Sequence, residues 1–415
     1  MKQTKRSRIS HCIKKTAALL AVALCLHGCS RLQAMDDRAV LEPQTTVEEP
    51  GAHAVSGEGG EPSPGGGETA ETSDTPSNAE TVENGPSVPW APGIFAVNPE
   101  AAASPQVVLK LVDGETPGAQ DHGHCIANFV SLAEAISGGS IHIEIQDTHL
   151  SGDNVTILDR MTDQDPLVDL AVVTPIDLAI FGDDKSPILS MPFLFRSHDQ
   201  FVKFAESSLG QAFLDSPGIR GIGVQSLFFI DEGFRYFAST DQYKIRDLSD
   251  LYTLRMASGT EKNMLYRSLV GQAGAFIQWI EKPDLHDSFA AGFDVAPVTM
   301  QEFQGLSLAD CAQNLSLDRH SMSIFELVIR DDSWTGRLTA AQRNALQQAA
   351  RLAMRENLAR APELESALQN SIRDSGVNLV ETQSHADWQK DVSLIIKNNV
   401  PPNLMPYYQA IDALG

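Results

Sequence analysis

Residues 168–214 constrain the fold of this chain more than any other segment. They open with a four-residue apolar run at 170–173, which has the length and composition of a strand buried in a parallel sheet. A polar turn follows, then the compact block Met-Pro-Phe-Leu-Phe-Arg at 191–196, and then a helical stretch that ends in Leu-Gly-Gln at 209–211. A strand that leads into helix in this way is the unit of an α/β fold.

The same alternation of strand and helix continues from residue 106 to residue 415. A segment of roughly 310 residues is long enough to bury a large core and to form two lobes. Thr339 and Gln342 have the spacing of a capping box, and the apolar residues that follow keep a helical period to the end of that segment. We therefore predict a helix at 124–137, a helical C-terminus, and strands at 107–112, 141–145, 170–173, 222–229 and 254–257.

The first 28 residues have the layout of a lipoprotein signal peptide. Six basic residues between Lys2 and Lys15 precede an apolar stretch at 16–26 that is too short to span a bilayer. The segment closes on Leu-His-Gly-Cys, which resembles the bacterial lipobox. The prediction is cleavage before Cys29, attachment of lipid to its sulfur and a periplasmic location. The alternative is an uncleaved anchor or an ordinary secretory signal with an incidental cysteine.

Residues 29–105 are predicted to form a disordered acidic tether. Gly, Pro, Ser, Thr and Glu dominate this stretch, so it has too few apolar residues to build a core. The whole chain has a formal charge of −23, and loss of the signal peptide removes six basic and no acidic residues, which leaves −29. Such an acidic chain argues against nucleic acid as a partner, because phosphate contacts need basic side chains.

Two cysteines remain in the segment predicted to fold, Cys125 and Cys311. Export permits a disulfide between them, but two separate thiols are the favoured interpretation. The run Asp-His-Gly-His-Cys at 121–125 has metal-ligating residue types. They crowd into one turn, however, and no second pair with suitable spacing follows. We expect neither a metal nor a cofactor.

Taken in order, these segments resemble the extracytoplasmic solute-binding proteins of TRAP transporters, the DctP type. In that family a strand reading D-(M/L)-A-V-V leads into L-P-F-L-F-R and a helix closing on L-G-Q, as 168–214 does here. The resemblance covers nearly all of 106–395. It implies a two-lobed, periplasmic-binding-protein-like α/β fold with a ligand cleft between the lobes, and a binding protein rather than an enzyme.

The resemblance also implies a division of residues 106–415. Lobe one would comprise 106–232 and a segment after 318, and lobe two would comprise 233–317 and part of the C-terminal helices. Closure of the lobes around a ligand would couple occupancy to recognition by the permease subunits of the transporter in the membrane.

Two arginines carry the ligand hypothesis. Arg235 lies in Gly-Phe-Arg and is similar to the family's G-x-R-x-x-T, whose arginine is a cation near the substrate carboxylate. Arg255 is matched to the arginine of the family pattern D-L-K-G-L-K-I-R-V-P. In the family, that arginine makes a bidentate contact with the substrate carboxylate. Guanidinium donates two parallel hydrogen bonds to a carboxylate and stays charged when desolvated. The alternative for each arginine is a structural salt bridge, which so acidic a chain easily supplies.

The resemblance suggests three further ligand contacts. Trp279 lies eight residues after Gly271, the spacing of a family aromatic residue that packs on the ligand, although an ordinary core residue is the alternative. Thr174 follows the strand at 170–173, and the carboxyl ends of strands are where open α/β sheets bind ligands. His122 follows the first strand, where the family's loop faces the cleft.

One departure from the family pattern bears on the ligand. The family's A-L-Q-x-G-x-V-D-G-x-E-N-P has a ligand-binding asparagine, and here Val298 or Thr299 takes its place, depending on a one-residue gap. Each buried polar group left without a partner costs about 1–3 kcal/mol. The predicted ligand is therefore a small organic carboxylate with an apolar body, or an amphipathic molecule of that kind.

The predicted function is the lipid-anchored binding component of a TRAP transporter. A lipoprotein on the same fold that acts as a sensor or assembly partner is the alternative, and the missing asparagine favours it. One branch of the family works with a tetratricopeptide-repeat lipoprotein, so a partner of that kind stays open.

Overall fold

The computed structural model describes residues 95–113, 122–146, 154–163, 167–258 and 264–415. The predicted signal peptide, the lipidation site Cys29 and most of the predicted tether lie outside the described residues. The folded unit begins at Phe95, earlier than the boundary predicted at 106. Asn98 caps a short helix there by accepting a hydrogen bond from the backbone N–H of Ala101, whose side chain is fully buried. This last part of the predicted tether therefore belongs to the fold.

The described residues form an α/β fold, as predicted, and their strands belong to one ten-stranded sheet that mixes parallel and antiparallel pairs. The strand order is β2-β1-β3-β9-β4-β7-β5-β6, with β8 paired to β4 and β10 paired to β8. The strands are β1 (Val107–Asp113), β2 (Ile141–Ile145), β3 (Leu170–Val173), β4 (Val224–Ser239), β5 (Arg255–Ser258), β6 (Phe276–Trp279), β7 (Val295–Thr299), β8 (Asn314–Ser316), β9 (Ser321–Arg330) and β10 (Asn378–Val380).

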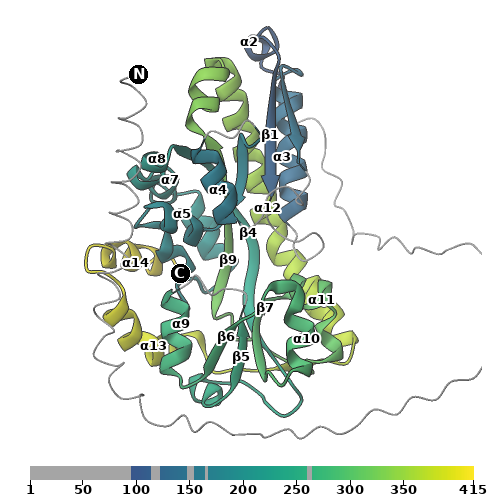
Figure 1. Cartoon of the computed structure of the whole chain (residues 1–415), viewed down its shortest axis with the longest axis vertical. Coiled ribbons are helices and arrows are strands. Elements are labelled where there is room, and N and C mark those ends of the chain that lie inside the picture. The colour runs from purple at the N-terminus through teal and green to yellow at the C-terminus, as the bar shows by residue number, and fades with distance from the viewer. Residues whose placement is uncertain (1–94, 114–121, 147–153, 164–166, 259–263) are drawn as a thin grey trace, which may run out of the picture. The chain divides into compact units, whose positions relative to one another are not determined.

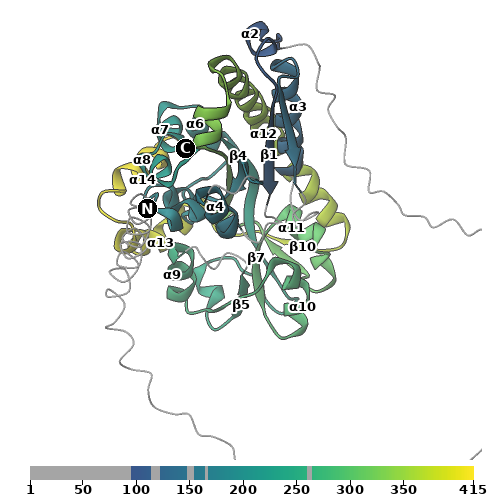
Figure 2. The same cartoon turned by 45° about the horizontal axis from the view of Figure 1, so that its top comes forward.

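Helices pack along this sheet, and the longest of them, α12, lies beside α3 and, further along, beside α11 (Figure 1; Figure 2). Thr339 caps α12 through the predicted capping box with Gln342. The α-helices are α2 (Pro99–Ala102), α3 (His122–Ile136), α4 (Asn154–Thr162), α5 (Pro175–Phe181), α6 (His198–Ala205), α7 (Ser208–Leu214), α8 (Pro217–Ile222), α9 (Met264–Gln272), α10 (Leu285–Ala290), α11 (Met300–Gly305), α12 (Ala340–Asp374), α13 (His385–Asn399) and α14 (Met405–Asp412).

Among these described helices, none is both long enough and apolar enough to cross a bilayer.

The helical stretch that was predicted to end in Leu-Gly-Gln is two helices. Ser207 separates α6 from α7, and its hydroxyl accepts the N–H groups of Leu209 and Gly210. Leu-Gly-Gln therefore lies inside the second helix. Gly210 is needed there, because an added Cβ would lie 2.3 Å from the carbonyl oxygen of Phe204.

Strand β4 is twice as long as the predicted strand at 222–229, and its continuation positions the candidate site. The Asp-Glu-Gly sequence at 231–233 has the composition of a turn, but the chain stays in the sheet through a β-bulge between Asp231 and Phe234. Gly233 supplies the positive φ of 89° that this bulge needs. Strand β4 consequently pairs with β9 before and across the bulge and with β7 after it.

The register shows that two groups of strands run toward this bulge from opposite directions. Strands β1, β2 and β3 are parallel. The last residue of β3, Val173, pairs with Glu326 of β9, which in turn pairs with Phe229 of β4. Strands β5, β6 and β7 are parallel to one another, and β7 runs antiparallel to β4 and ends opposite Arg235. The carboxyl ends of both groups therefore point at the middle of β4.

Candidate functional site

We call the residues at these carboxyl ends and in the middle of β4 the strand-end site. It contains Thr174 after β3, Ser258 at the end of β5, Trp279 at the end of β6, Thr299 at the end of β7, and Arg235 of β4. Open α/β sheets bind ligands at the carboxyl ends of their strands. The site thus contains four of the residues predicted from sequence, and the first and last of them, Thr174 and Thr299, are 125 positions apart in the chain.

The charges of the strand-end site centre on a buried arginine. Both terminal nitrogens of Arg235 donate to the carboxylate of Glu302, at 2.8 and 3.0 Å, and Lys282 Nζ lies 3.2 Å from the same carboxylate. Burial alone would raise the pKa of Glu302, but the charges of Arg235 and Lys282 outweigh it and lower the pKa to about 2. Glu302 is therefore an ion-pair partner of both cations.

Arg255 lies apart from this group. It is the first residue of β5, pairs with Phe276, and is exposed. Its Nη1 donates to the carbonyl of Gly292 at 2.9 Å, and its guanidinium stacks over the ring of Phe293 at 4.6 Å. The strand-end site is at the other end of β5, so the structure does not bring Arg255 and Arg235 to one carboxylate.

The sequence pattern itself explains this separation. When D-L-K-G-L-K-I-R is aligned on Asp250 and Leu251 without a gap, its second lysine falls at Arg255 and its arginine falls at Ala257. The glycine of the pattern then falls at Thr253, which has a positive φ of 66°. Because glycine is the residue that adopts this conformation most easily, the structure supports that alignment. A small apolar residue thus stands where the pattern has its ligand-binding arginine.

The side chains of the remaining predicted ligand contacts differ in how exposed they are. Trp279 is 40% exposed, so it is not a core residue. Val298 and Thr299 are fully buried, and the Thr299 hydroxyl accepts the N–H of Glu302 at the start of α11. The Thr174 hydroxyl forms the equivalent cap of α5, accepting the Asp177 N–H. Both threonines therefore fix the helices that follow them.

The residues after β1 are only partly described. His122 is the first residue of α3, and its side chain lies outside the described structure. His124 Nε2 lies 3.2 Å from Glu356 of α12, whereas Cys125 is buried and its Sγ donates to the Ala353 carbonyl. These two neighbours therefore face different surroundings. Cys125 and Cys311 are not joined by a disulfide bond.

A buried charge cluster that the sequence did not predict lies behind the bulge. His198 of α6 lies between Asp231 of β4 (2.6 Å) and Glu365 of α12 (3.2 Å). Glu365 also accepts from Arg319, at 3.0 Å. Burial lowers the pKa of His198, but its hydrogen bonds with the two carboxylates raise it further, to about 9. The cluster connects α6 and α12 to the bulge. Its only signal in the sequence is the acidic pair at 231–232, which has the composition of a turn.

A mixed α/β sheet whose two groups of parallel strands converge on one long central strand places the usual ligand-binding ends of both groups together. Residues 114–400 match the family described as bacterial extracellular solute-binding protein, family 7, also called DctP. The match covers more than half of the chain, and the chain belongs to this family.

Relatives agree with this assignment. A solute-binding protein of Chromohalobacter salexigens is 25% identical over 203 residues, which is 49% of this chain and 59% of the relative. The chain thus matches little more than half the length of that protein. The family is one of binding proteins rather than enzymes.

Solved structures share the fold. The TRAP periplasmic solute-binding protein of Ochrobactrum anthropi, with its C-terminus bound in the ligand-binding pocket, superposes with a TM-score of 0.68 at 17% identity, covering 74% of this chain and 95% of that one. That of Desulfovibrio desulfuricans, with sn-glycerol-3-phosphate, has a TM-score of 0.66 at 16% identity, covering 74% and 97%. That of C. salexigens, with D-glucuronate, has a TM-score of 0.64 at 19% identity, covering 74% and 100%.

Proposed function

We propose that this protein is the binding component of a TRAP-type secondary transporter, which captures a small organic carboxylate with an apolar body and delivers it to a membrane permease. The observation that carries the proposal is the convergence of both strand groups on the bulge of β4, beside the buried guanidinium of Arg235. Membership of the family and the anionic ligands of the solved relatives support it.

The side chains at the strand-end site favour a ligand with one acidic group. Arg235 already shares its charge with Glu302, and Ala257 stands at the position of the pattern's arginine. Val298 or Thr299, both fully buried, takes the place of the pattern's asparagine. A glucuronate has several hydroxyl groups, and each one buried without a partner would cost about 1–3 kcal/mol. A carboxylate with an apolar body avoids this cost, and the exposed ring of Trp279 offers it an apolar contact.

The test is mass spectrometry of the small molecules released when the purified mature chain is denatured, followed by calorimetric titration with the molecule found. An amphipathic carboxylate that rebinds with a one-to-one stoichiometry would support the proposal. A sugar acid would keep the transport function and contradict the apolar body. A neutral lipid-like molecule would contradict the carboxylate.

We also propose that the protein is held at a membrane in the periplasm through lipid on Cys29, with acyl chains such as palmitate. The basic and apolar segments before Cys29 support this. Mass spectrometry of the N-terminal peptide should show the mass of a diacylglyceryl group on this cysteine. The Cys29→Ala variant should then appear in the soluble periplasmic fraction, and a variant that stays with the membrane would contradict the anchor.

Affinity capture of the lipidated chain from solubilised membranes tests the partners. The permease subunits should be recovered when the ligand is present. Recovery of a tetratricopeptide-repeat lipoprotein would place the chain in that branch of the family.

A further inference from the structure

Lys282 connects the segment that follows Trp279 to the buried pair of Arg235 and Glu302. It opens the short 3₁₀-helix η5 (Lys282–Asp284), three residues after Trp279 at the end of β6. Its Nζ lies 3.2 Å from Glu302 Oε1, the oxygen that also accepts a hydrogen bond from Arg235 Nη2 at 3.0 Å. The other oxygen of Glu302 accepts from Arg235 Nη1 at 2.8 Å. One buried carboxylate therefore joins β4 to the segment after β6.

Strand β6 needs such a connection, because it lies at the edge of the sheet. Among the described strands, it pairs only with β5, over the four residues from Phe276 to Trp279. Strands β5 and β7 separate it from β4, so the backbones of β6 and β4 lie roughly 14 Å apart across the sheet at the usual strand spacing. Beyond β6, the N–H of Ile280 donates to the Ser258 carbonyl at 3.1 Å, and Lys282 follows two residues later. The ion pair of Lys282 thus fixes the chain just beyond the end of β6.

The ring of Trp279 depends on this fixed backbone. Its side chain is 40% exposed, so packing covers only part of the ring. The helix η5 that follows has no side-chain cap, because Glu281 makes no capping hydrogen bond. An exposed side chain at the end of an edge strand keeps its position only as well as the backbone beneath it is held. The link from Lys282 to Glu302 therefore bears directly on where the indole lies.

We propose that Lys282 is a positioning residue of the strand-end site, which acts through Glu302 to hold Trp279 at a fixed separation from Arg235. A carboxylate ligand would contact the guanidinium with its acidic group and the indole with its apolar body. The separation between these two contacts would then select the length of that body, and Lys282 would set it without touching the ligand. This inference rests on the proposed function, because it takes Arg235 and Trp279 to be ligand contacts.

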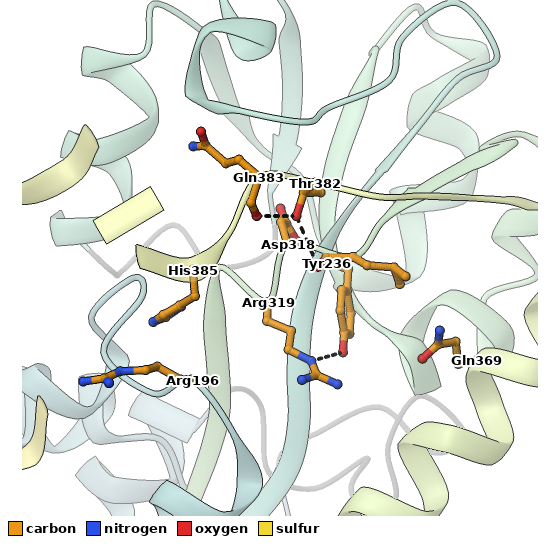
Figure 3. A pocket seen from close by; sticks show the side chains of 9 residues that line it. Arg196, Tyr236, Asp318, Arg319, Gln369, Thr382, Gln383 and His385 are labelled. Carbon is orange, nitrogen blue, oxygen red and sulfur yellow. Dashed lines mark hydrogen bonds between the residues drawn. The ribbon is translucent and has the colours of Figure 1, made fainter. Parts of the chain in front are cut away.

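A second concave region, on the other face of β4, is a poor site for a carboxylate. Tyr236 follows Arg235 in β4, so its side chain points to the opposite face, where it lines a pocket of about 310 Å³ (Figure 3). Figure 3 shows the guanidinium groups of Arg196 and Arg319 pointing apart there, and each is paired with a carboxylate. The lining also holds a buried oxygen of Asp318 that has no partner among the described residues. A carboxylate probe is therefore expected to report on the strand-end site.

The first test needs no ligand. The full mature chain is labelled with fluorotryptophan, and the fluorine NMR signal of Trp279 is assigned by its loss in Trp279→Phe. Lys282→Met keeps an aliphatic side chain but removes the charge, so this signal should shift. Lys282→Arg should restore its position, because arginine also pairs with Glu302. Lys244→Met is the matched control, since Lys244 is exposed and lies outside the strand-end site, and it should leave the signal unchanged. An unchanged signal in Lys282→Met overturns the inference.

The second test measures binding by calorimetric titration with butanoate, hexanoate and octanoate. Lys282→Met should weaken binding of the acid that the wild type prefers by about fivefold, and should reduce the discrimination between chain lengths. The effect of Lys282→Met should disappear in a Trp279→Ala background, because residues that act through one another are not additive. The melting temperature of each variant controls for folding. An equal loss of affinity in both backgrounds overturns the inference, because Lys282 would then act independently of the indole.

The two proposals fail in different ways. If the wild type binds none of the three acids, or if Arg235→Gln binds them as tightly as the wild type, the carboxylate assignment of the proposed function fails and the inference fails with it. If binding depends on Arg235 while Lys282→Met changes neither the affinity nor the preferred chain length, only the inference about Lys282 is overturned.

Discussion

At the scale of single residues, the balance of charge around Glu302 decides what the strand-end site attracts. Two cations share this fully buried carboxylate, and neither a salt bridge alone nor a ligand contact alone describes Arg235. A buried carboxylate between two cations stabilises mainly by keeping them paired, because an unpaired buried charge is far more costly than the pair. Glu302 therefore fixes the position of the Arg235 guanidinium.

The two arginines are expected to differ in binding. Arg235→Gln should weaken binding of the captured carboxylate at least tenfold, because it removes the charge-assisted donor beside the strand ends. Arg255→Gln is the matched control and should change the affinity less than twofold, because its guanidinium is engaged by the Gly292 carbonyl and Phe293. Calorimetric titration of both variants checks this. A large loss for Arg255→Gln would restore the role that the sequence pattern assigned to it.

The carboxylate of Glu302 also predicts an acid response. Its pKa falls from 4.5 to about 2 on folding, so its contribution to stability is present above pH 4.5 and is lost as the pH falls toward 2. Glu302→Gln should lower the free energy of unfolding at pH 7 by about 3–5 kcal/mol, because Arg235 and Lys282 lose their shared partner. Urea unfolding at pH 7 and pH 3 measures this: the difference in free energy of unfolding between wild type and variant should be smaller at pH 3. An equal difference at both values would contradict the assignment.

At the scale of elements, the bulge of β4 is held by polar groups rather than by apolar packing. Asp231 accepts the Gly233 N–H and His198, while its backbone exchanges two hydrogen bonds with the side chain of Asn357 in α12. Each group that a bulge removes from the regular ladder needs another partner, and here α6 and α12 supply them. A polar sequence can therefore continue as a strand through the centre of the sheet.

His198 gives this element a pH dependence. Its pKa rises from 6.5 to about 9 on folding, so the stabilisation is complete below pH 6.5 and is lost as the pH rises toward 9. Relative to His198→Gln, the wild-type protein should lose on the order of 2–3 kcal/mol between pH 6 and pH 9. Burial raises the pKa of Glu326 to about 8, so this residue also lowers stability as the pH rises. Its effect is the same in wild type and variant and cancels when the two are compared. Urea unfolding at pH 6 and pH 9 measures the free energy of unfolding of both proteins. An equal change with pH in wild type and His198→Gln would contradict the prediction.

The elements that the sequence predicted well are those with purely local signals. The apolar runs of β1, β2 and β3 and the Thr339 capping box were located to within a residue or so. The length of β4 was wrong, because the partners of Asp231 come from residues 33 and 126 positions away. The separation of Arg255 from Arg235 was missed because an alignment shift of two residues moves a side chain from one end of a short strand to the other.

At the scale of the whole folded unit, the two strand groups are joined by elements that run past the bulge. Strand β9 pairs with β3 of the first group, β4 pairs with β7 of the second, and β4 and β9 pair with each other. Helix α12 packs against α3 near one group and α11 near the other. Pro362 lies inside α12, where it removes a helical hydrogen bond and permits bending. The bulge of β4 and this proline lie in the two elements that a closing motion would have to bend.

We therefore predict that ligand binding brings the two groups closer. Spin labels at the exposed positions Ser131 of α3 and Asp287 of α10 report on this, in a background with Cys29→Ala and Cys311→Ser. The distance between the labels should shorten by several ångströms when the ligand is added, because a ligand between the strand ends contacts both groups and favours the closed state. A label pair at Ser131 and Asp159 of α4, both beside the first strand group, is the control and should not move. Equal distances with and without ligand for the first pair would contradict this prediction and show that the two strand groups form one rigid body.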